Sequence, residues 1–242
     1  MIGRTQIMRL LKYKNALRRM RSFGFIKAYS NNLGDAIGLS SVQVRKDFSL
    51  FNITGNKKGG YVIDELLNRI DEILGKQISH EIILIGCGKI GNALINYSGF
   101  EGEAIKIVAA FDHNPEKVNR EAHIPILPME ELKDYIINNK IEVAIIAVPD
   151  IEAQRVFDHI CNAGIKGVLN FAPIKLIERP DCIINDVNIA DEIESIFYFI
   201  NDLETKSDNN SENNGENNNS ENNVENNSSE YNSSEYNNEN EQ

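Results

Sequence analysis

The chain has no tryptophan, and its three cysteines stand far apart at Cys87, Cys161 and Cys182. An odd and scattered set forms no disulfide framework, and it favours a reducing cytoplasm. The four histidines never pair with cysteine or with one another at metal-ligand spacing, so we expect no metal site. No apolar run approaches the roughly 18 residues of a membrane helix, and the start does not resemble a signal peptide. We therefore expect a cytoplasmic protein without a membrane segment.

Acidic residues are rare at the N-terminal end of the chain, and basic residues are absent from its C-terminal end. Residues 1–61 hold twelve Lys and Arg against two acids, whereas residues 207–242 hold nine acids and no base. The overall net charge of −11 conceals this separation. A basic segment of this size favours binding to nucleic acid or another polyanion.

The acidic end also lacks apolar residues. Asn, acids and Ser make up 31 of residues 207–242. Such a segment cannot bury enough apolar area to offset its conformational entropy, so we expect a disordered tail over residues 205–242. The tail could compete with DNA for the basic segment, but a solvated extension without a specific role fits its composition better.

The basic segment has the pattern of a helix-turn-helix domain. A first amphipathic helix is predicted by apolar residues at helical spacing, which are Ile7, Leu10, Leu11, Leu17 and Met20. Ser30 can cap a short second helix that Gly38 ends, and Ser40 can cap a third over residues 41–50. Two short helices joined by a turn with glycine are typical of DNA-binding domains.

The third helix has the features of a recognition helix. Val44 and Phe48 lie four residues apart and are expected to face inward. Its outer surface then carries the expected DNA contacts, which are Ser41, Val42, Arg45 and Lys46. A glycine-rich hairpin is predicted over residues 53–63, with Lys57 and Lys58 at its tip. We predict a winged-helix domain over residues 1–78; the alternative is a basic hairpin on an unrelated helical bundle.

Residues 79–184 have the pattern of a Rossmann domain. The buried strand predicted over residues 81–85 runs into a GxGxxG turn and then a helix. The turn consists of Gly86, Cys87, Gly88, Lys89, Ile90 and Gly91. Its glycines permit a tight turn, close approach of a pyrophosphate and packing of helix on strand. We take these six residues as the centre of a dinucleotide site.

An acid follows at the position that binds the ribose in such sites. Asp112 ends the next strand, about 20 residues after the turn, and favours NAD(H) over NADP(H). A further strand predicted over residues 143–148 ends at Pro149, where ligands bind beyond a parallel strand. The alternation of strands and helices predicts an α/β parallel sheet covered on both faces. The alternative is a Rossmann-like domain that has lost its cofactor.

We predict no enzymatic activity. Too few residues follow the sheet to build a substrate domain, and His113 and His159 lie where a surface role fits better. Cys87 could be a redox-sensing thiol, although a small packed residue is the simpler interpretation. A bound nucleotide would then act as a signal.

Ordered matches along the chain give it a family resemblance. In the basic segment they are Arg9-Leu10 with Tyr13, residues 44–49 and Gly60-Tyr61. Further along they are residues 86–94, Tyr97, Gly99-Phe100, Phe111-Asp112, Val148-Pro149, residues 163–167, Asn170-Phe171-Ala172-Pro173 and residues 192–196 with Tyr198-Phe199. With these residues the chain resembles the redox-sensing transcriptional repressors called Rex, from about Arg4 to Leu203.

The resemblance implies a homodimer that binds operator DNA and is released when NADH, rather than NAD⁺, occupies the Rossmann domain. It implies that residues 185–204 form a C-terminal helix exchanged between subunits. It also adds Tyr97 and Phe171 to the nucleotide site and Tyr61 to the DNA-binding residues.

Three departures from the family pattern bear on the coupling between sites. The Arg of the family's helix-1 motif is Asn15 here, and the Asp of the C-terminal helix is Asn188. The resemblance implies that this pair, with Tyr97, carries the coupling. The hairpin also lacks two of the family's glycines. Two alternatives stay open: a small NAD-dependent oxidoreductase with an appended basic domain, and a family member that binds DNA whatever the redox state.

Overall fold

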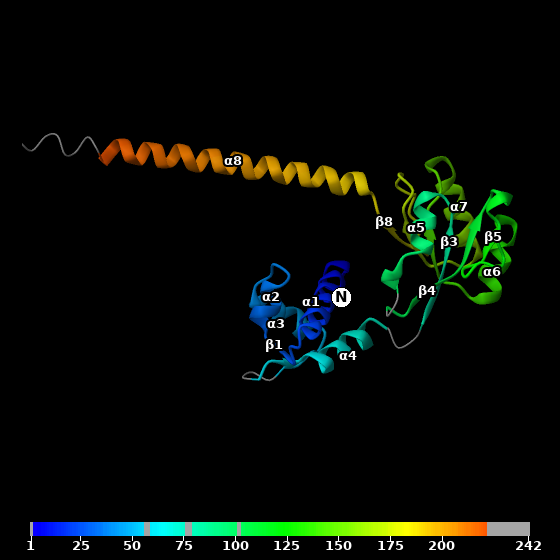
Figure 1. Cartoon of the computed structure of the whole chain (residues 1–242), viewed down its shortest axis with the longest axis horizontal. Coiled ribbons are helices and arrows are strands. Elements are labelled where there is room, and N and C mark those ends of the chain that lie inside the picture. Colours follow the sequence, from blue (N-terminus) through cyan, green and yellow to red (C-terminus); the bar gives the residue numbers. More distant parts are fainter. Residues whose placement is uncertain (1, 56–58, 76–78, 101–102, 222–242) are drawn as a thin grey trace, which may run out of the picture. The chain divides into compact units, whose positions relative to one another are not determined.

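The computed structural model describes residues 2–55, 59–75, 79–100 and 103–221, with side chains described through residue 205. The chain divides into two units, residues 1–186 and residues 187–242. Within the first unit an N-terminal helical part precedes a Rossmann part (Figure 1). The Lys57 and Lys58 of the predicted hairpin tip lie outside the described residues.

The N-terminal part has the winged-helix order of elements. Its helices are α1 (Arg4–Ser22), α2 (Ser30–Asp35), α3 (Ser41–Leu50) and α4 (Ile63–Ile73). Two short strands, β1 (Lys27–Ala28) and β2 (Tyr61–Val62), pair antiparallel. The helical periods of the sequence therefore predicted α1 and α3 within a few residues.

The apolar stripe of α1 forms the centre of this part. Leu10, Tyr13 and Leu17 recur at intervals of three and four residues and are fully buried. The ring of Phe48, from α3, meets the rings of Tyr13 and Tyr61 edge to face at 5.2 and 5.0 Å between centroids. These aromatic contacts hold α3 between α1 and β2, so the outer face of α3 is presented on a rigid base.

The two predicted helix caps had different outcomes. The Ser40 hydroxyl accepts a hydrogen bond from the Gln43 N–H at 3.2 Å, which confirms it as the N-cap of α3. The predicted cap at Ser30 is wrong, because Ser30 is the first residue of α2 and Tyr29 is its N-cap. The Asn32 side chain accepts from the Tyr29 N–H at 2.7 Å instead, which fixes the start of the helix from inside.

The predicted pairing of the hairpin is also wrong. Residues 53–54 form no strand; β2 pairs instead with β1, in the register Lys27 to Val62 and Ala28 to Tyr61. The Ile53 N–H donates to the Phe48 carbonyl at 2.8 Å, which ties this segment to the end of α3 and leaves the edge of β2 to β1. Tyr61 therefore stands between the helix-turn-helix and the glycine-rich segment.

The Rossmann part is a sheet of six strands, all of them parallel. The strands are β3 (His80–Ile85), β4 (Ile105–Asp112), β5 (Ile126–Pro128), β6 (Val143–Ile146), β7 (Gly167–Asn170) and β8 (Ile183–Asp186). Their order is β5-β4-β3-β6-β7-β8, so the chain reverses its direction across the sheet between β3 and β6. Ligands of such sheets bind beyond the carboxyl ends of the strands at this reversal. The predicted parallel α/β fold is confirmed.

Helices pack on both faces of the sheet. They are α5 (Lys89–Ile95), α6 (Leu132–Asn139) and α7 (Asp150–Ala163), with short 3₁₀ turns η1 (Ser98–Phe100), η2 (Pro115–Lys117) and η3 (Met129–Glu131). One buried cluster joins the sheet to α6 and α7, and a second joins it to Leu94 and Ile95 of α5. The residues of β3 from Ile82 onward are buried, as its apolar run predicted.

Among its described residues, the second unit contains α8 (Ile189–Glu221). Between Ile189 and Leu203 its large apolar side chains are all exposed, from 43% at Ile200 to 68% at Tyr198. The helix extends to Glu221, beyond the end predicted at residue 204. No helix among the described residues is long and apolar enough to cross a membrane.

Candidate nucleotide and nucleic-acid sites

The glycine turn after β3 requires glycine at two of its three positions. Gly86 has φ +96°, and a Cβ there would lie 2.5 Å from the carbonyl oxygen of Ala147, which directly follows the neighbouring strand β6. A Cβ on Gly91 would lie 1.9 Å from the Gly86 carbonyl oxygen. These contacts let the chain leave β3 sharply and let α5 pack directly against the strand.

Gly88 is different, because nothing in the fold itself requires glycine there. Its φ is −77°, and no described atom lies within 4 Å of a Cβ built on it. It is the N-cap of α5, so the first N–H groups of the helix point past it. Lys89 and Ile90 follow on the exposed first turn of α5. The open space beside Gly88 is where backbone can approach a phosphate.

Asp112, at the end of β4, is joined to this turn by hydrogen bonds. Its carboxylate accepts from the Cys87 N–H at 2.7 Å and from the Asn114 N–H at 2.9 Å, and Lys117 Nζ lies 3.0 Å away. Burial by itself raises the pKa of Asp112, but these donors outweigh burial and hold the pKa below its ordinary value. The carboxylate therefore stays ionised and holds the glycine turn against β4.

Sequence reasoning missed Lys117 as a member of this cluster. It lies on η2, five residues after Asp112, and its side chain is 38% exposed. A basic residue beyond the end of a Rossmann strand was the available signal. Its ammonium brings positive charge close to the acid predicted to bind ribose.

Cys87 has the environment of a packed residue. Its side chain is 1% exposed, and burial, together with the charge of Asp112, raises the pKa of the thiol to about 11. A thiol in this environment is protonated near neutral pH and is a poor nucleophile. The structure therefore favours the packing interpretation over a redox-sensing thiol at this position.

The remaining predicted nucleotide residues also follow strand ends. Pro149 comes after β6 and is the exposed N-cap of α7, and Phe171 comes directly after β7. The loop holding Phe171 is fixed by the buried Asn170, whose amide donates to the carbonyl of Ile174 and to the Asp186 carboxylate, both at 2.9 Å. The sheet thus brings the turn, Asp112, Pro149 and Phe171 to one edge.

Tyr97 lies farther along, between α5 and η1. Tyr97 is 57% exposed, and its ring packs edge to face on the Phe100 ring at 5.1 Å between centroids. A Cβ on Gly99 would lie 2.2 Å from the Tyr97 ring, so glycine allows the ring to fold back over η1. The ring therefore belongs to the segment that follows the phosphate-binding helix.

The outer face of α3 carries two cations that no described residue neutralises. Arg45 and Lys46 are both exposed, and neither has an ion pair or hydrogen bond within the described ranges. Val42 is 63% exposed and Ser41 is half-buried on the same helix. The structure therefore brings together all four predicted residues of the third helix.

A polar hollow of about 320 Å³ lies beside Arg45. It is lined by residues from three segments, which are Tyr29, Ser30, Asn31, Ser41, Arg45, Gly55, Gly60 and Tyr61. Tyr29, Ser30 and Asn31 are contributors that sequence reasoning missed. Their polar side chains before and within the first turn of a helix-turn-helix were the available signal. Hydroxyl, amide and guanidinium donors around one hollow match the oxygens of a phosphate.

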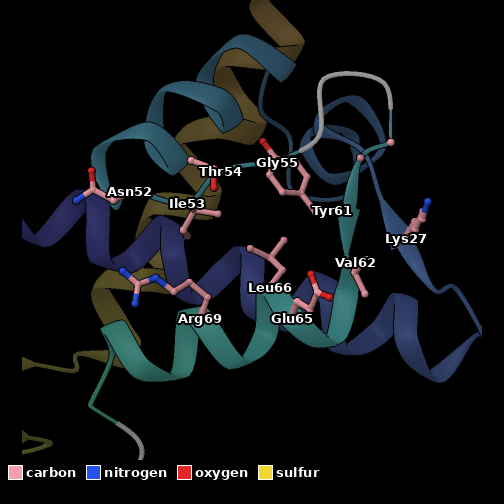
Figure 2. A pocket seen from close by; sticks show the side chains of 12 residues that line it. Lys27, Asn52, Ile53, Thr54, Gly55, Tyr61, Val62, Glu65, Leu66 and Arg69 are labelled. Atoms are coloured by element: carbon pink, nitrogen blue, oxygen red, sulfur yellow. The ribbon is translucent and has the colours of Figure 1, made fainter.

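A second hollow, of about 410 Å³, lies between the glycine-rich segment, β2 and α4 (Figure 2). Leu66, Glu65 and Arg69 line it from α4 below, and Ile53 lines it from the segment above them. The ring of Tyr61 points toward Gly55, where a Cβ would lie 2.3 Å from the ring. Tyr61 therefore lines both hollows and packs against Gly55.

The predicted coupling residues belong to different elements of the chain. Asn15 is exposed on α1 and lines a hollow with Lys12 and Arg19. Asn188 precedes α8, where its side chain accepts from the Ala190 N–H at 3.0 Å. No described contact tests the predicted pairing of Asn15 with Asn188, so it stays a prediction.

Comparison with known proteins finds a family match in each of the two parts of the chain. Residues 77–174 match the family described as CoA binding domain, and residues 2–49 match the one described as putative DNA-binding protein N-terminus. A redox-sensing transcriptional repressor Rex from Streptococcus agalactiae is 36% identical over 196 residues, which is 80% of this chain and 93% of that protein. The repressor Rex 1 of Enterococcus faecalis is 34% identical over 79% of this chain and 89% of its own length.

Solved structures agree with these relatives. The Rex-family repressor RSP in complex with β-NAD⁺ and operator DNA matches with a TM-score of 0.78 and 29% identity, covering 88% of this chain and 98% of that one. RSP in complex with β-NADH matches with a TM-score of 0.76 and 30% identity, covering 85% and 97%.

Proposed function

Because the chain belongs to the Rex family of redox-sensing transcriptional repressors, we propose that it binds operator DNA through α3 and leaves that DNA when NADH binds beyond β3 and β6. The protein is a regulator and not an enzyme. The bound dinucleotide reports the NADH/NAD⁺ ratio, and binding of NADH releases the protein from the DNA. The site of action is the cytoplasm.

On the DNA side, α3 enters the major groove with Arg45 and Lys46 toward the DNA. Arg45 lines the polar hollow beside β2, whereas Lys46 lines a different hollow on the α1 side of α3. The two cations therefore reach phosphates or base edges on both sides of the recognition helix. Asn31 and Ser30 hold a backbone phosphate in the polar hollow. Lys57, Lys58 and Tyr61 extend the interface along the minor groove.

On the nucleotide side, the pyrophosphate lies in the open space beside Gly88, where the N–H groups of α5 point. Asp112 accepts hydrogen bonds from the adenosine ribose, and Pro149 and Phe171 line the path toward the nicotinamide. CoA and NAD share an adenosine diphosphate unit, so the description of the matching family and the NADH complex of RSP agree on the part this turn holds.

The active species is a homodimer. The apolar side chains of α8, all exposed within residues 189–203, need a covering surface. A second copy of the chain supplies it by exchange of this helix, and a dimer matches the two half-sites of a palindromic operator.

The observation that carries the proposal is the presence, in one chain, of unneutralised cations on α3 and an open glycine turn after β3. The experiment that tests it measures DNA binding by the full chain. Duplexes that bind are selected from a random pool, and their dissociation constants are measured with NADH, with NAD⁺ and without nucleotide. We expect NADH to weaken binding more than NAD⁺ does. Equal dissociation constants in all three conditions contradict the proposal.

A further inference from the structure

A buried ammonium on α1 is held by carboxylates from two parts of the first unit. Lys14 is 1% exposed, and its Nζ lies 2.6 Å from Asp71 Oδ1 and 3.3 Å from Glu103 Oε2. The contact with Asp71, on α4, is an ion pair whose angles fall outside those of a hydrogen bond. Glu103 precedes β4 in the Rossmann part. Because an ammonium without a partner is costly to bury, Lys14 depends on both acids.

Glu103 binds two basic residues of the same helix. Its second oxygen, Oε1, accepts from Arg18, which lies one turn after Lys14 on α1. Residues four apart share a face of a helix, so one carboxylate spans both. A separate contact joins Arg4, near the start of α1, to Asn185 on β8. The helix is therefore held to the Rossmann part near both of its ends.

Glu103 is also connected to the segment that follows the nucleotide turn. Its N–H donates to the Phe100 carbonyl at 3.1 Å, and the Phe100 ring packs on Tyr97 at 5.1 Å. Tyr97 in turn follows α5, and its N–H donates to the Leu94 carbonyl at 3.2 Å. These hydrogen bonds and packed rings connect α5 to Glu103.

The path continues from α1 to the recognition helix. Arg9 and Tyr13, on α1, both donate to the Asp47 carboxylate, which lies on α3 and is almost fully buried. Lys14 directly follows Tyr13. The contact of Glu103 with α1 therefore lies next to the contacts that orient α3. The described contacts thus form one chain from α5 to the DNA-binding face.

We propose that Glu103, with Lys14 and Arg18, positions α1 and transmits the nucleotide state of the Rossmann part to the recognition helix. The inference rests on the proposed function and names the contacts that regulate it. Coupling requires a contact whose strength differs between two states of the protein. Glu103 is placed to make such a contact, because it lies in the segment that follows the nucleotide turn and binds α1 directly.

The test is a comparison of Glu103→Gln with the unmodified full chain. The amide keeps the size of the side chain but removes the charge that Lys14 and Arg18 share. We expect the dissociation constant for NADH to stay within about twofold. The ratio of DNA dissociation constants with and without NADH should fall at least about fivefold, the low end of typical coupling. Glu131→Gln is the control, because Glu131 pairs with Arg120 inside the Rossmann part and should leave the ratio unchanged.

A milder variant guards against misfolding. Arg18→Gln removes the ion pair of Arg18 with Glu103 at a partly exposed position, and it should lower the ratio by less than Glu103→Gln does. Amide hydrogen exchange in α1 supplies a readout that needs no DNA. NADH should change exchange in α1 of the unmodified protein and not in Glu103→Gln.

The outcomes separate the inference from the proposed function. A chain whose DNA binding ignores NADH, and whose α1 exchange also ignores it, contradicts both. A chain that responds to NADH and keeps the full response in a folded Glu103→Gln variant overturns the inference alone. Loss of the response with retained NADH binding supports it.

Discussion

Arg9 and Asp47 form a bidentate ion pair between α1 and α3, with Arg9 Nε and Nη2 each 2.6 Å from a different carboxylate oxygen. Tyr13 donates its hydroxyl to the same carboxylate at 2.8 Å, and Gln43 donates its amide at 2.7 Å. All four contacts converge on a side chain that is 3% exposed. The planar guanidinium and carboxylate groups, matched in this way, fix the angle between α1 and α3.

Asp47→Ala should therefore destabilise the winged-helix part. Removing the acid leaves Arg9 without its partner and Tyr13 with a buried hydroxyl, a loss of about 3–5 kcal/mol for a buried pair. Calorimetry of the full chain should show a lowered transition for this part. Asp134→Ala, at an exposed position on α6, is the control. A melting curve unchanged by Asp47→Ala contradicts the role of the pair.

The same acid predicts a dependence of stability on pH. Burial raises the pKa of Asp47, but its hydrogen bonds with Arg9, Tyr13 and Gln43 outweigh burial and leave it below the ordinary value. A lowered folded pKa stabilises the fold above the unfolded value of about 3.9, and this contribution disappears as the pH falls through the folded value. The melting temperature should thus fall on acidification. It should fall less in Asp47→Asn, which has no proton to gain there. Parallel acid curves for the two proteins contradict the assignment.

The elements predicted from the sequence are those whose signals are local. The third helix was predicted at residues 41–50 because Ser40 supplies a cap and Val44 and Phe48 supply the period. The glycine turn was predicted because its residues stand together between a strand and a helix. The parallel sheet followed from repeated alternation, although β5 is only three residues long and β8 has only two apolar residues, so neither strand has a pattern that could be recognised.

The contacts that sequence missed join distant residues. Strand β1 is two residues long and pairs with β2 more than 30 positions later, so neither strand has a pattern of its own. Lys14 and Glu103 are 89 positions apart, and nothing around either residue indicates the other. Charge alone could not distinguish a buried Lys14 from the exposed Lys12 two positions earlier. Such pairings become visible only when the fold brings the segments together.

Replacing Arg45 and Lys46 together by Ala should weaken operator binding by at least about tenfold, since each contact is worth about 1–3 kcal/mol. The dependence of binding on salt should become shallower, because fewer counterions are released. Fluorescence anisotropy at several salt concentrations measures both quantities. Lys133→Ala, an exposed base on α6, is the matched control. An unchanged affinity and salt slope would remove α3 from the interface.

Gly88→Val should abolish NADH binding without unfolding the protein. The position tolerates a side chain, since its φ is −77° and the space around it is open, but that space is the one the pyrophosphate needs. Ala93→Val, on the exposed surface of α5, is the control for an added branched side chain. Calorimetric titration and a thermal melt decide the matter. Normal affinity in a folded Gly88→Val variant contradicts the predicted site.

Asp112→Ala should weaken NADH binding by about 1.5–3 kcal/mol through loss of a charged acceptor. The same change removes the acceptor of the Cys87 N–H, so part of the loss arises from a looser turn. Asp112→Asn separates the two effects, because its amide oxygen still accepts from Cys87 but no longer carries charge. We expect the Asn variant to bind more tightly than the Ala variant and less tightly than the unmodified chain. Equal affinity in all three proteins contradicts a role for Asp112 in binding.

The replacement of two charges by Asn15 and Asn188 should make the NADH response of this chain smaller than that of typical relatives. Restoring the pair with Asn15→Arg and Asn188→Asp should enlarge the response, while either single change should not, because a lone charge lacks its partner. Asp at position 188 can still accept from the Ala190 N–H, so the start of α8 should be preserved. Lys14 and Arg18 do not replace the missing charge freely, since Glu103 already engages both. DNA dissociation constants with NADH and with NAD⁺, measured for all four proteins, test the prediction. A shift above about a hundredfold in the unmodified chain, roughly 2.7 kcal/mol, with no gain from the double change, shows that coupling does not depend on this pair.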